Sequence, residues 1–405
     1  MEMQNLISSE QTSDKSINSY LGDDLLTEIL ACLPVKPLFR FKCVSKLWNR
    51  LISSDRLQRR LQLPPGLFYR FQVRDSEPEE YSYISLSDAN SDDGGIQDIS
   101  LSFLPQYPNI EIIDSCNGLI LLLWLEMDEG TCQMEYYVCN PLNKRWVALP
   151  KPRGRVGFDL ARLAFDPTVS PDFQVIHIGN PSDWEVTSVM AEIFSSSTGQ
   201  WVESRHPCEP VSPLFLPQIS VFLNGILYFL ILPWHILGFN VRGGACRLIR
   251  LPEERRHHAF LKLSKGCIYY VNNDNSVINV WTIEDTSTCD WSLKHTVTMK
   301  ALEQQVSLPI CDRCWYDLYH HSFHPFDVHP ERETVFLKTH CKIFSYHFMS
   351  STLEELCCAE ECTGLFSASV WFFESVSTYK PCPNALDWTL SCSQSMQLVD
   401  VDKLL

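Results

Sequence analysis

Two cysteines followed by a group of histidines are the residues whose types and spacing most resemble a metal or catalytic site. Cys311 and Cys314 have the two-residue separation of zinc-binding cysteines. The histidines that follow are His320, His321, His324 and His329. A zinc ion with an open coordination position there would activate water, as in a metal-dependent enzyme. The histidines follow Cys314 too closely for a zinc-finger helix, so we favour a cysteine-containing loop with surface histidines.

Other patterns that carry catalysis or bind cofactors are incomplete or missing from the sequence. The acidic segment 88–94 alternates like a calcium-binding loop, but Asp93 stands where that loop needs glycine and Ile99 where it needs glutamate. The sequence contains no G-x-S-x-G, no glycine-rich phosphate loop and no H-E-x-x-H. We therefore expect no catalytic residue, no metal and no cofactor.

The amino-acid composition excludes two classes of partner and indicates the cellular compartment. With 33 basic and 49 acidic residues, the 405-residue chain has a formal charge of −16, which phosphate backbones and anionic lipids would repel. We expect neither nucleic acid nor a membrane as a partner. The 17 cysteines are odd in number, and the N-terminus lacks the basic start and apolar run of a signal peptide. Reduced thiols in the cytoplasm and/or nucleus are the expectation.

The uncharged stretch 211–241 resembles a membrane span in composition alone. It contains Asn224-Gly225, Pro233 and His235. Asn-Gly is a strong hairpin signal and proline interrupts a helix, so the stretch favours a β-hairpin over a transmembrane helix.

The elements that would position functional residues begin with a short helical module at residues 20–60. Residues 1–19, with scattered Ser, Asn and Gln, predict a disordered tail. Apolar residues then recur at helical spacing, which predicts a helix over 23–32 that Pro34 ends, followed by a second helical series. So short a module cannot bury all of this apolar surface itself. Part of it must contact the next domain or another protein.

The segment from Leu21 to Trp48 resembles an F-box, the plant form in particular. Its order is Leu-Pro-Val at 33–35, Leu38, Arg-Phe at 40–41, Cys-Val-Ser-Lys at 43–46 and Trp48. The resemblance implies binding to the Skp-family adaptor and, through it, to a cullin-RING ubiquitin ligase. The adaptor-binding residues that it implies are Leu21, Leu25, Leu26, Ile29, Leu30, Leu33, Pro34, Val35, Leu38, Phe41, Val44 and Trp48. Gly22 departs from the family, which usually has proline there, and glycine leaves this turn looser.

Residues 61–405 contain a repeat of about 45 residues, which is typical of propeller blades. Its landmark is a tryptophan six residues after Asn, Ser or Asp. The landmarks are Trp146, Trp201 and Trp291, with Cys246 at this position in a degenerate copy, so that the intervals are 55, 45 and 45 residues. A tryptophan that recurs at one position of each repeat is more often packing between blades than part of a ligand-binding face.

Strand and turn signals accompany the repeat. Asn117-Gly118 and Asn224-Gly225 each precede an apolar strand, and Phe344, Tyr346 and Phe348 alternate with polar residues, as in a half-buried strand. The segment 137–150 resembles a kelch-type blade and the F-box-associated domain of plant F-box proteins, and 323–327 with 335–337 resembles a later strand pair of that domain. The predicted fold class is α+β multidomain: a short helical F-box, then a mostly β, propeller-like domain. Only 16 glycines is sparse for kelch repeats, so the blade count stays open and a curved β-sandwich is the alternative.

These observations predict a substrate-recognition subunit of a Skp/cullin/F-box E3 ubiquitin ligase. Residues 20–60 would dock on the adaptor, and the β domain of residues 61–405 would hold an unidentified protein substrate. We expect a non-catalytic chain that acts by proximity, as a monomer within the complex. One alternative is an F-box receptor gated by a glycan or another small molecule. The other is a metal-dependent enzyme that uses Cys311, Cys314 and the nearby histidines.

Overall fold

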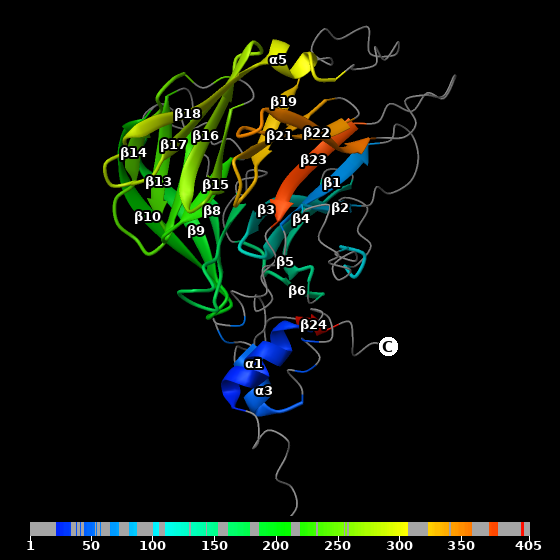
Figure 1. Ribbon diagram of the computed structural model, residues 1–405. Coiled ribbons are helices and arrows are strands. Elements are labelled where there is room, and N and C mark those ends of the chain that lie inside the picture. Colours follow the sequence, from blue (N-terminus) through cyan, green and yellow to red (C-terminus); the bar gives the residue numbers. More distant parts are fainter. Residues whose placement is uncertain are drawn as a thin grey trace, which may run out of the picture. The chain divides into compact units, whose positions relative to one another are not determined.

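The fold is described from a computed structural model of the chain (Figure 1). Of the 405 residues, the structure describes 22–33, 38, 41, 44–52, 54, 57, 65–72, 81–86, 100–104, 110–128, 131–142, 144–152, 161–178, 186–211, 219–231, 234–254, 256, 259–306, 323–339, 342–358, 372–379 and 398–400. The chain divides into two compact units, the first formed by residues 1–63 with 89–98 and the second by residues 64–88 with 99–405.

Among the described residues of the first unit are helices α1 (Asp23–Ala31) and α3 (Lys46–Ile52). Helix α1 confirms the predicted helix at 23–32 to within one residue. Two acids, Asp23 and Asp24, occupy its first turn, where negative charge stabilises the positive end of the helix dipole. The carboxylate of Asp23 also lies 3.1 Å from Nη2 of Arg50, which ties the start of α1 to α3.

The described strands of the second unit form six antiparallel sheets, which we call blades 1 to 6. Blade 1 contains β3 (Ile110–Cys116), β4 (Leu119–Asp128), β5 (Thr131–Asn140), β6 (Arg145–Ala148) and the added β24 (Leu398–Asp400). Blade 2 contains β7 (Ala161–Ala164), β8 (Gln174–Ile178), β9 (Val186–Ser195) and β10 (Gln200–Val211). Blade 3 contains β11 (Ser220–Leu223), β12 (Ile226–Ile231), β13 (His235–Asn240) and β14 (Arg247–Arg250).

The remaining blades continue this order along the chain. Blade 4 contains β15 (Phe260–Ser264), β16 (Cys267–Asn273), β17 (Val277–Ile283) and β18 (Trp291–Thr298), followed by the short helix α5 (Met299–Glu303). Blade 5 contains β19 (His324–Val328), β20 (Thr334–Lys338), β21 (Lys342–His347) and β22 (Thr352–Cys358). Blade 6 has three strands in the order β2 (Ser82–Ser85), β1 (Gly66–Gln72) and β23 (Phe372–Tyr379).

The blades form a closed ring. Strands β3, β7, β11, β15, β19 and β23 each contact the next in this order, and β23 contacts β3 again. Blades 2 to 5 are built from four consecutive strands, and blade 1 adds β24 to four such strands. Blade 6 instead pairs segments far apart in the chain: β1 pairs with β23 from Gly66 opposite Tyr379 to Gln72 opposite Phe372. Figure 1 shows this pairing as a blue strand beside an orange one. The architecture is therefore a β-propeller, and the β-sandwich alternative is wrong.

The propeller core lies between adjacent blades, so most strands are buried on both faces. Blades 4 and 5, for example, enclose a cluster that includes Val271, Val280, Val335 and Phe344. This arrangement corrects the half-buried strand predicted around Phe344. In β21 the alternating Ser345 is also buried, because a neighbouring blade covers each face of the sheet.

The predicted turns are confirmed. Asn224 and Gly225 have positive φ angles of 51° and 80° and join β11 to β12, so the uncharged stretch contains a hairpin. Asn117 and Gly118, with φ of 45° and 89°, join β3 to β4 in the same way. Within the described residues, no helix has the length and apolar character needed to cross a membrane.

Candidate functional site

The first unit exposes apolar side chains. Leu25 is 56% exposed, Ile29 is 49% exposed and Val44 is 60% exposed. Leu25 and Ile29 are four residues apart on α1 and therefore lie on the same face of the helix. Exposed large apolar residues on one face of a small unit indicate a surface that another protein covers.

The other predicted adaptor-binding residues hold the unit together instead of facing solvent. Leu26, Leu30 and Leu38 are buried in a cluster with Leu51 and Ile52. Around that cluster pack the partly buried side chains of Leu33, Phe41 and Trp48. The rings of Phe41 and Trp48 meet edge to face with centroids 5.3 Å apart. Leu21, Pro34 and Val35 lie outside the described residues.

Gly22 is the N-cap of α1 and provides no side-chain cap. Its φ of −61° and ψ of 155° are ordinary extended angles that most residues adopt, and a Cβ atom at this position would meet nothing within 4 Å. Proline fixes φ near this value. Neither the backbone nor the available space therefore requires glycine here.

The repeated tryptophans connect neighbouring blades, which confirms the packing interpretation for two of them. Trp201, at the start of the outer strand of blade 2, donates from Nε1 to the carbonyl oxygen of Pro150 at 2.6 Å. Trp291 does the same in blade 4, with the carbonyl oxygen of Arg250 at 2.8 Å. At the degenerate position, the backbone N–H of Cys246 donates to the Pro207 carbonyl at 2.7 Å.

Trp146 occupies the equivalent place in blade 1. It is 8% exposed and packs against Tyr137 with ring centroids 5.6 Å apart. Its indole nitrogen has no hydrogen-bond partner within the part of the chain that the structure describes. This tryptophan therefore contributes packing without the link to a preceding blade.

The cysteines and histidines that resemble a metal site in the sequence lie largely outside the described residues. Cys311, Cys314, His320 and His321 all lie in the segment 307–322, which the structure does not describe. Two of the histidines are described. His329 is buried and its Nδ1 accepts hydrogen bonds from the backbone N–H groups of Glu331 and Arg332, so it shapes the turn between β19 and β20. His324 begins β19.

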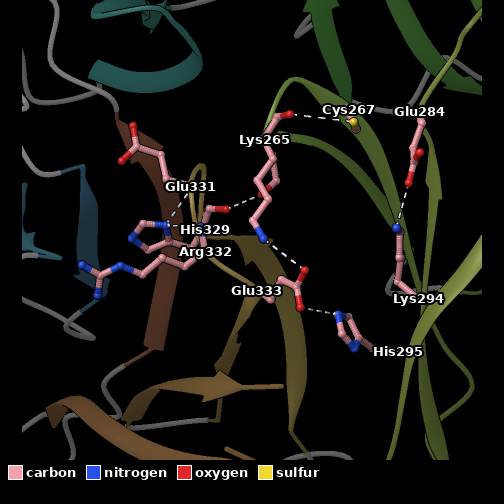
Figure 2. Close-up of polar contacts among 10 residues, drawn as sticks. Lys265, Cys267, Glu284, Lys294, His295, His329, Glu331, Arg332 and Glu333 are labelled. Carbon is pink, nitrogen blue, oxygen red and sulfur yellow. Dashed lines mark hydrogen bonds and ion pairs between the residues drawn. The ribbon is translucent and has the colours of Figure 1, made fainter. Parts of the chain in front are cut away.

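Polar side chains also join blades 4 and 5, as Figure 2 shows. Nζ of Lys265 lies 3.0 Å from Oε1 of Glu333, and Nε2 of His295 lies 3.4 Å from Oε2 of the same carboxylate. The His295 ring stacks on Phe348 with centroids 4.0 Å apart. Burial lowers the pKa of His295, whereas the hydrogen bond from Lys265 lowers the pKa of Glu333. In the described ranges, no group of three or more His, Cys, Asp or Glu side chains is placed to hold a metal ion.

A charged cavity at the propeller centre was not anticipated from the sequence. It has a volume of about 120 Å³ and is lined by residues of β3, β7, β11 and β15, with Asp114 and Lys262 among them. Arg162 on β7 and Asp327 on β19 are buried charges that accompany these two. For Arg162, Lys262 and Asp327, the available signal was a single Arg, Lys, Asp or Glu in a short apolar strand, whereas the strand of Asp114 also contains Glu111.

Comparison with known proteins agrees with both units. Residues 19–60 match the F-box domain, and residues 98–349 match the family described as F-box protein At3g26010-like, beta-propeller. The F-box protein At5g07610 of Arabidopsis thaliana is 27% identical over 83% of this chain and 85% of its own length. The F-box protein At5g49610 of the same plant is 26% identical over 91% of this chain and 99% of its own length.

Similarity to solved structures is weak. A family 117 glycoside hydrolase of the marine bacterium Zobellia galactanivorans, Zg3597, is 10% identical, with 81% of this chain and 93% of that chain covered and a TM-score of 0.34. A likeness at this level says nothing about activity.

Proposed function

Because the chain belongs to the family of At3g26010-like F-box proteins with a β-propeller, we propose that it is a substrate-recognition subunit of a Skp/cullin/F-box ubiquitin ligase. The first unit would bind the Skp-family adaptor, and the propeller would bind a protein substrate. The exposed apolar side chains of Leu25 and Ile29 on α1 carry the first half of this proposal. They would become buried in the complex, and burying a leucine or isoleucine contributes roughly 1.5–3 kcal/mol.

The propeller suits the second half of the proposal because its ring of six blades is a rigid platform. The turns that join the strands would present the substrate contacts, as loops on a rigid scaffold commonly do. The chain itself would perform no chemistry. Holding a substrate near the charged ubiquitin-conjugating enzyme raises its effective concentration, and this proximity is the whole mechanism.

We place this function in the cytoplasm or nucleus, where thiols stay reduced. Among the described cysteines, Cys139 and Cys246 are buried free thiols. Burial raises the pKa of both thiols, so that these cysteines remain unreactive packing residues.

Affinity purification of the tagged full chain from plant cells tests the proposal. With the proteasome inhibited, the preparation should contain the Skp-family adaptor, a cullin and at least one further protein that accumulates. A matched chain with Leu25→Asp and Ile29→Asp should lose adaptor and cullin together and retain the further protein. Adaptor and cullin absent from the unmodified preparation would refute the proposal.

A further inference from the structure

The cavity at the propeller centre has a defined place and composition. Strands β3, β7, β11 and β15 of four successive blades line it, and Pro330, in the turn after β19, completes its wall. Its apolar lining comes from Leu163, Val221, Phe222, Leu263 and Pro330. At about 120 Å³ it is comparable with cavities of about 150 Å³ that hold a benzene-sized molecule. The cavity can therefore take a small molecule with an apolar part.

Two opposite charges face this cavity. The Asp114 carboxylate accepts hydrogen bonds from the backbone N–H groups of Leu163 at 2.7 Å and Ser115 at 2.8 Å. It makes no ion pair within the residues that the structure describes. The second charge is the Lys262 ammonium, whose side chain is 29% exposed.

Each of the two charges has a buried counterpart of opposite sign. Lys262 lies 3.0 Å from Oδ2 of Asp327, which is 1% exposed. Arg162 is 2% exposed, and its positive charge lowers the pKa of the Asp114 carboxyl. Burial nevertheless raises the pKa of Asp114 more than Arg162 and Lys262 lower it. Because Arg162 and Asp327 are buried, Asp114 and Lys262 are the charges that a molecule in the cavity can reach.

A ligand with a single charge would be attracted by one of these groups and repelled by the other. A ligand with one cationic and one anionic group can pair with both Asp114 and Lys262, and its net charge of zero leaves the net charge of the site unchanged. The Ser220 hydroxyl, which also lines the cavity, has no hydrogen-bond partner among the described residues and offers a further polar contact after side-chain rotation.

We propose that the central cavity is a binding site for a small zwitterion of the α-amino acid class. The ligand ammonium pairs with Asp114, the ligand carboxylate pairs with Lys262, and a short aliphatic side chain contacts Val221 and Phe222. This site is separate from the F-box surface, and the proposal does not depend on the proposed function.

Three probes of matched shape test the site on the full chain by ligand-detected NMR titration. L-valine carries both charges, 2-methylpropylamine has only the ammonium, and 3-methylbutanoate has only the carboxylate. L-valine should bind about tenfold or more tightly than either analogue, since each charged hydrogen bond is worth at least a factor of this size. Equal binding of the three probes, or no binding of L-valine, would overturn the proposal.

Two substitutions should change the selectivity in opposite directions. With Asp114→Asn the ammonium loses its partner, so L-valine should bind no better than 3-methylbutanoate. With Lys262→Gln, which keeps a donor for Asp327, L-valine should bind no better than 2-methylpropylamine. Asp114→Asn needs its own folding check by thermal unfolding, because the asparagine amide can accept only one of the two backbone hydrogen bonds that the carboxylate accepts. If neither variant folds, the comparison of the three probes on the unmodified chain decides.

Glu284→Gln and Lys294→Gln provide matched controls. They remove the same two charges from an exposed ion pair of 2.8 Å on blade 4 (Figure 2). Neither control should alter the order of the three probes by binding affinity. The proposal would be contradicted if a control abolished the preference for L-valine, or if the preference survived Asp114→Asn. Either result would show that binding depends on the overall charge of the chain and not on the cavity. Adaptor co-purification with Asp114→Asn should remain unchanged, so failure of this site and failure of the proposed function are distinguishable.

Discussion

The indole Nε1 of Trp201 donates a 2.6 Å hydrogen bond to the carbonyl oxygen of Pro150, across the interface between blades 1 and 2. The ring also packs in the buried cluster that these two blades share. The landmark of the sequence repeat is thus a connection between blades.

Trp201→Phe should destabilise the propeller more than Trp146→Phe. Both rings are nearly buried and both pack on an aromatic neighbour, with centroids 5.5 Å apart for Trp201 and 5.6 Å for Trp146. Only Trp201 makes a hydrogen bond to the preceding blade within the described residues, and its loss leaves a carbonyl oxygen unsatisfied at a cost of about 1–3 kcal/mol. Urea unfolding of both variants measures the difference. An equal loss of unfolding free energy in the two variants would contradict a stabilising role for this hydrogen bond.

Gly22→Pro should stabilise the first unit. The φ of −61° at Gly22 is the angle that proline fixes, and a Cβ atom there would meet nothing within 4 Å. The expected gain is about 0.4–1 kcal/mol, because proline restricts the unfolded chain. Gly22→Ala is the matched control and should give a smaller gain, since alanine restricts the unfolded chain less than proline does and is a poor N-cap. Hydrogen exchange of the α1 amides reports the change, and faster exchange with proline would contradict it.

Acid should weaken the contact between blades 4 and 5 in two steps. Burial lowers the pKa of His295 below its usual 6.5, so the folded state prefers the neutral ring, and stability present above pH 6.5 is lost as the pH falls. The pKa of Glu333 is also lowered, chiefly by its hydrogen bond from Lys265, so that its contribution is present above pH 4.5 and is lost below that value. Lys294 is the other charge that acts on both groups.

His295→Phe should remove the first step and leave the second. Phenylalanine keeps the stack on Phe348 and has no group that titrates. Thermal unfolding from pH 7.5 to 3 covers both steps and measures the effect. If the variant loses stability between pH 6.5 and 5 as steeply as the unmodified chain does, His295 is not the cause.

Removal of residues 1–63 and removal of residues 1–72 should have different consequences. The first truncation ends before β1, so all six blades keep their strands and the melting temperature of the propeller should change little. The second deletes β1, the middle strand of blade 6, which pairs with both β2 and β23. The ring would then open, and the melting temperature should fall sharply. Differential scanning calorimetry of both truncations makes the comparison, and a collapse with the shorter truncation would contradict it.

Much of this architecture could be predicted from local sequence patterns. The apolar residues at helical spacing indicate helix α1: Leu21, Leu25, Ile29 and Leu33 recur every four residues, and Leu26 and Leu30 widen the stripe. Asn117-Gly118 and Asn224-Gly225 indicate turns between strands. The repeated tryptophans indicate the blades, because each landmark lies at the start of an outer strand or, for Cys246, directly before one. Local patterns suffice here because helices and turns depend on residues close in the chain.

The closure of the ring and the central cavity could not be predicted in this way. Strands β1 and β23 lie about 300 residues apart in sequence, and no local pattern in either segment identifies the other as its pairing partner. Asp114 and Lys262 face one cavity only because the ring brings β3 and β15 to the same channel. The sequence also did not show which apolar residues of α1 are buried, since Leu25 and Ile29 lie at the surface whereas their neighbours Leu26 and Leu30 lie in the core.

This division determines the variant that tests adaptor binding. Changing Leu30 to an acid would place a charge in the core of the first unit, where the side chain is 1% exposed, and would unfold the unit. Changing Leu25 and Ile29 to aspartate leaves that core intact. Val202, 61% exposed on β10 of the propeller, is a matched control for an apolar-to-acid change at an exposed position.

The most direct measurement is the affinity of the purified chain for the purified Skp-family adaptor by calorimetry. The chain with Leu25→Asp and Ile29→Asp should bind the adaptor about 100-fold or more weakly than the unmodified chain, because two buried apolar contacts are lost at roughly 1.5 kcal/mol each. Val202→Asp should bind as the unmodified chain does. Unchanged adaptor affinity in the Leu25 and Ile29 double variant, with its helices intact by circular dichroism, would contradict adaptor binding through this face of α1.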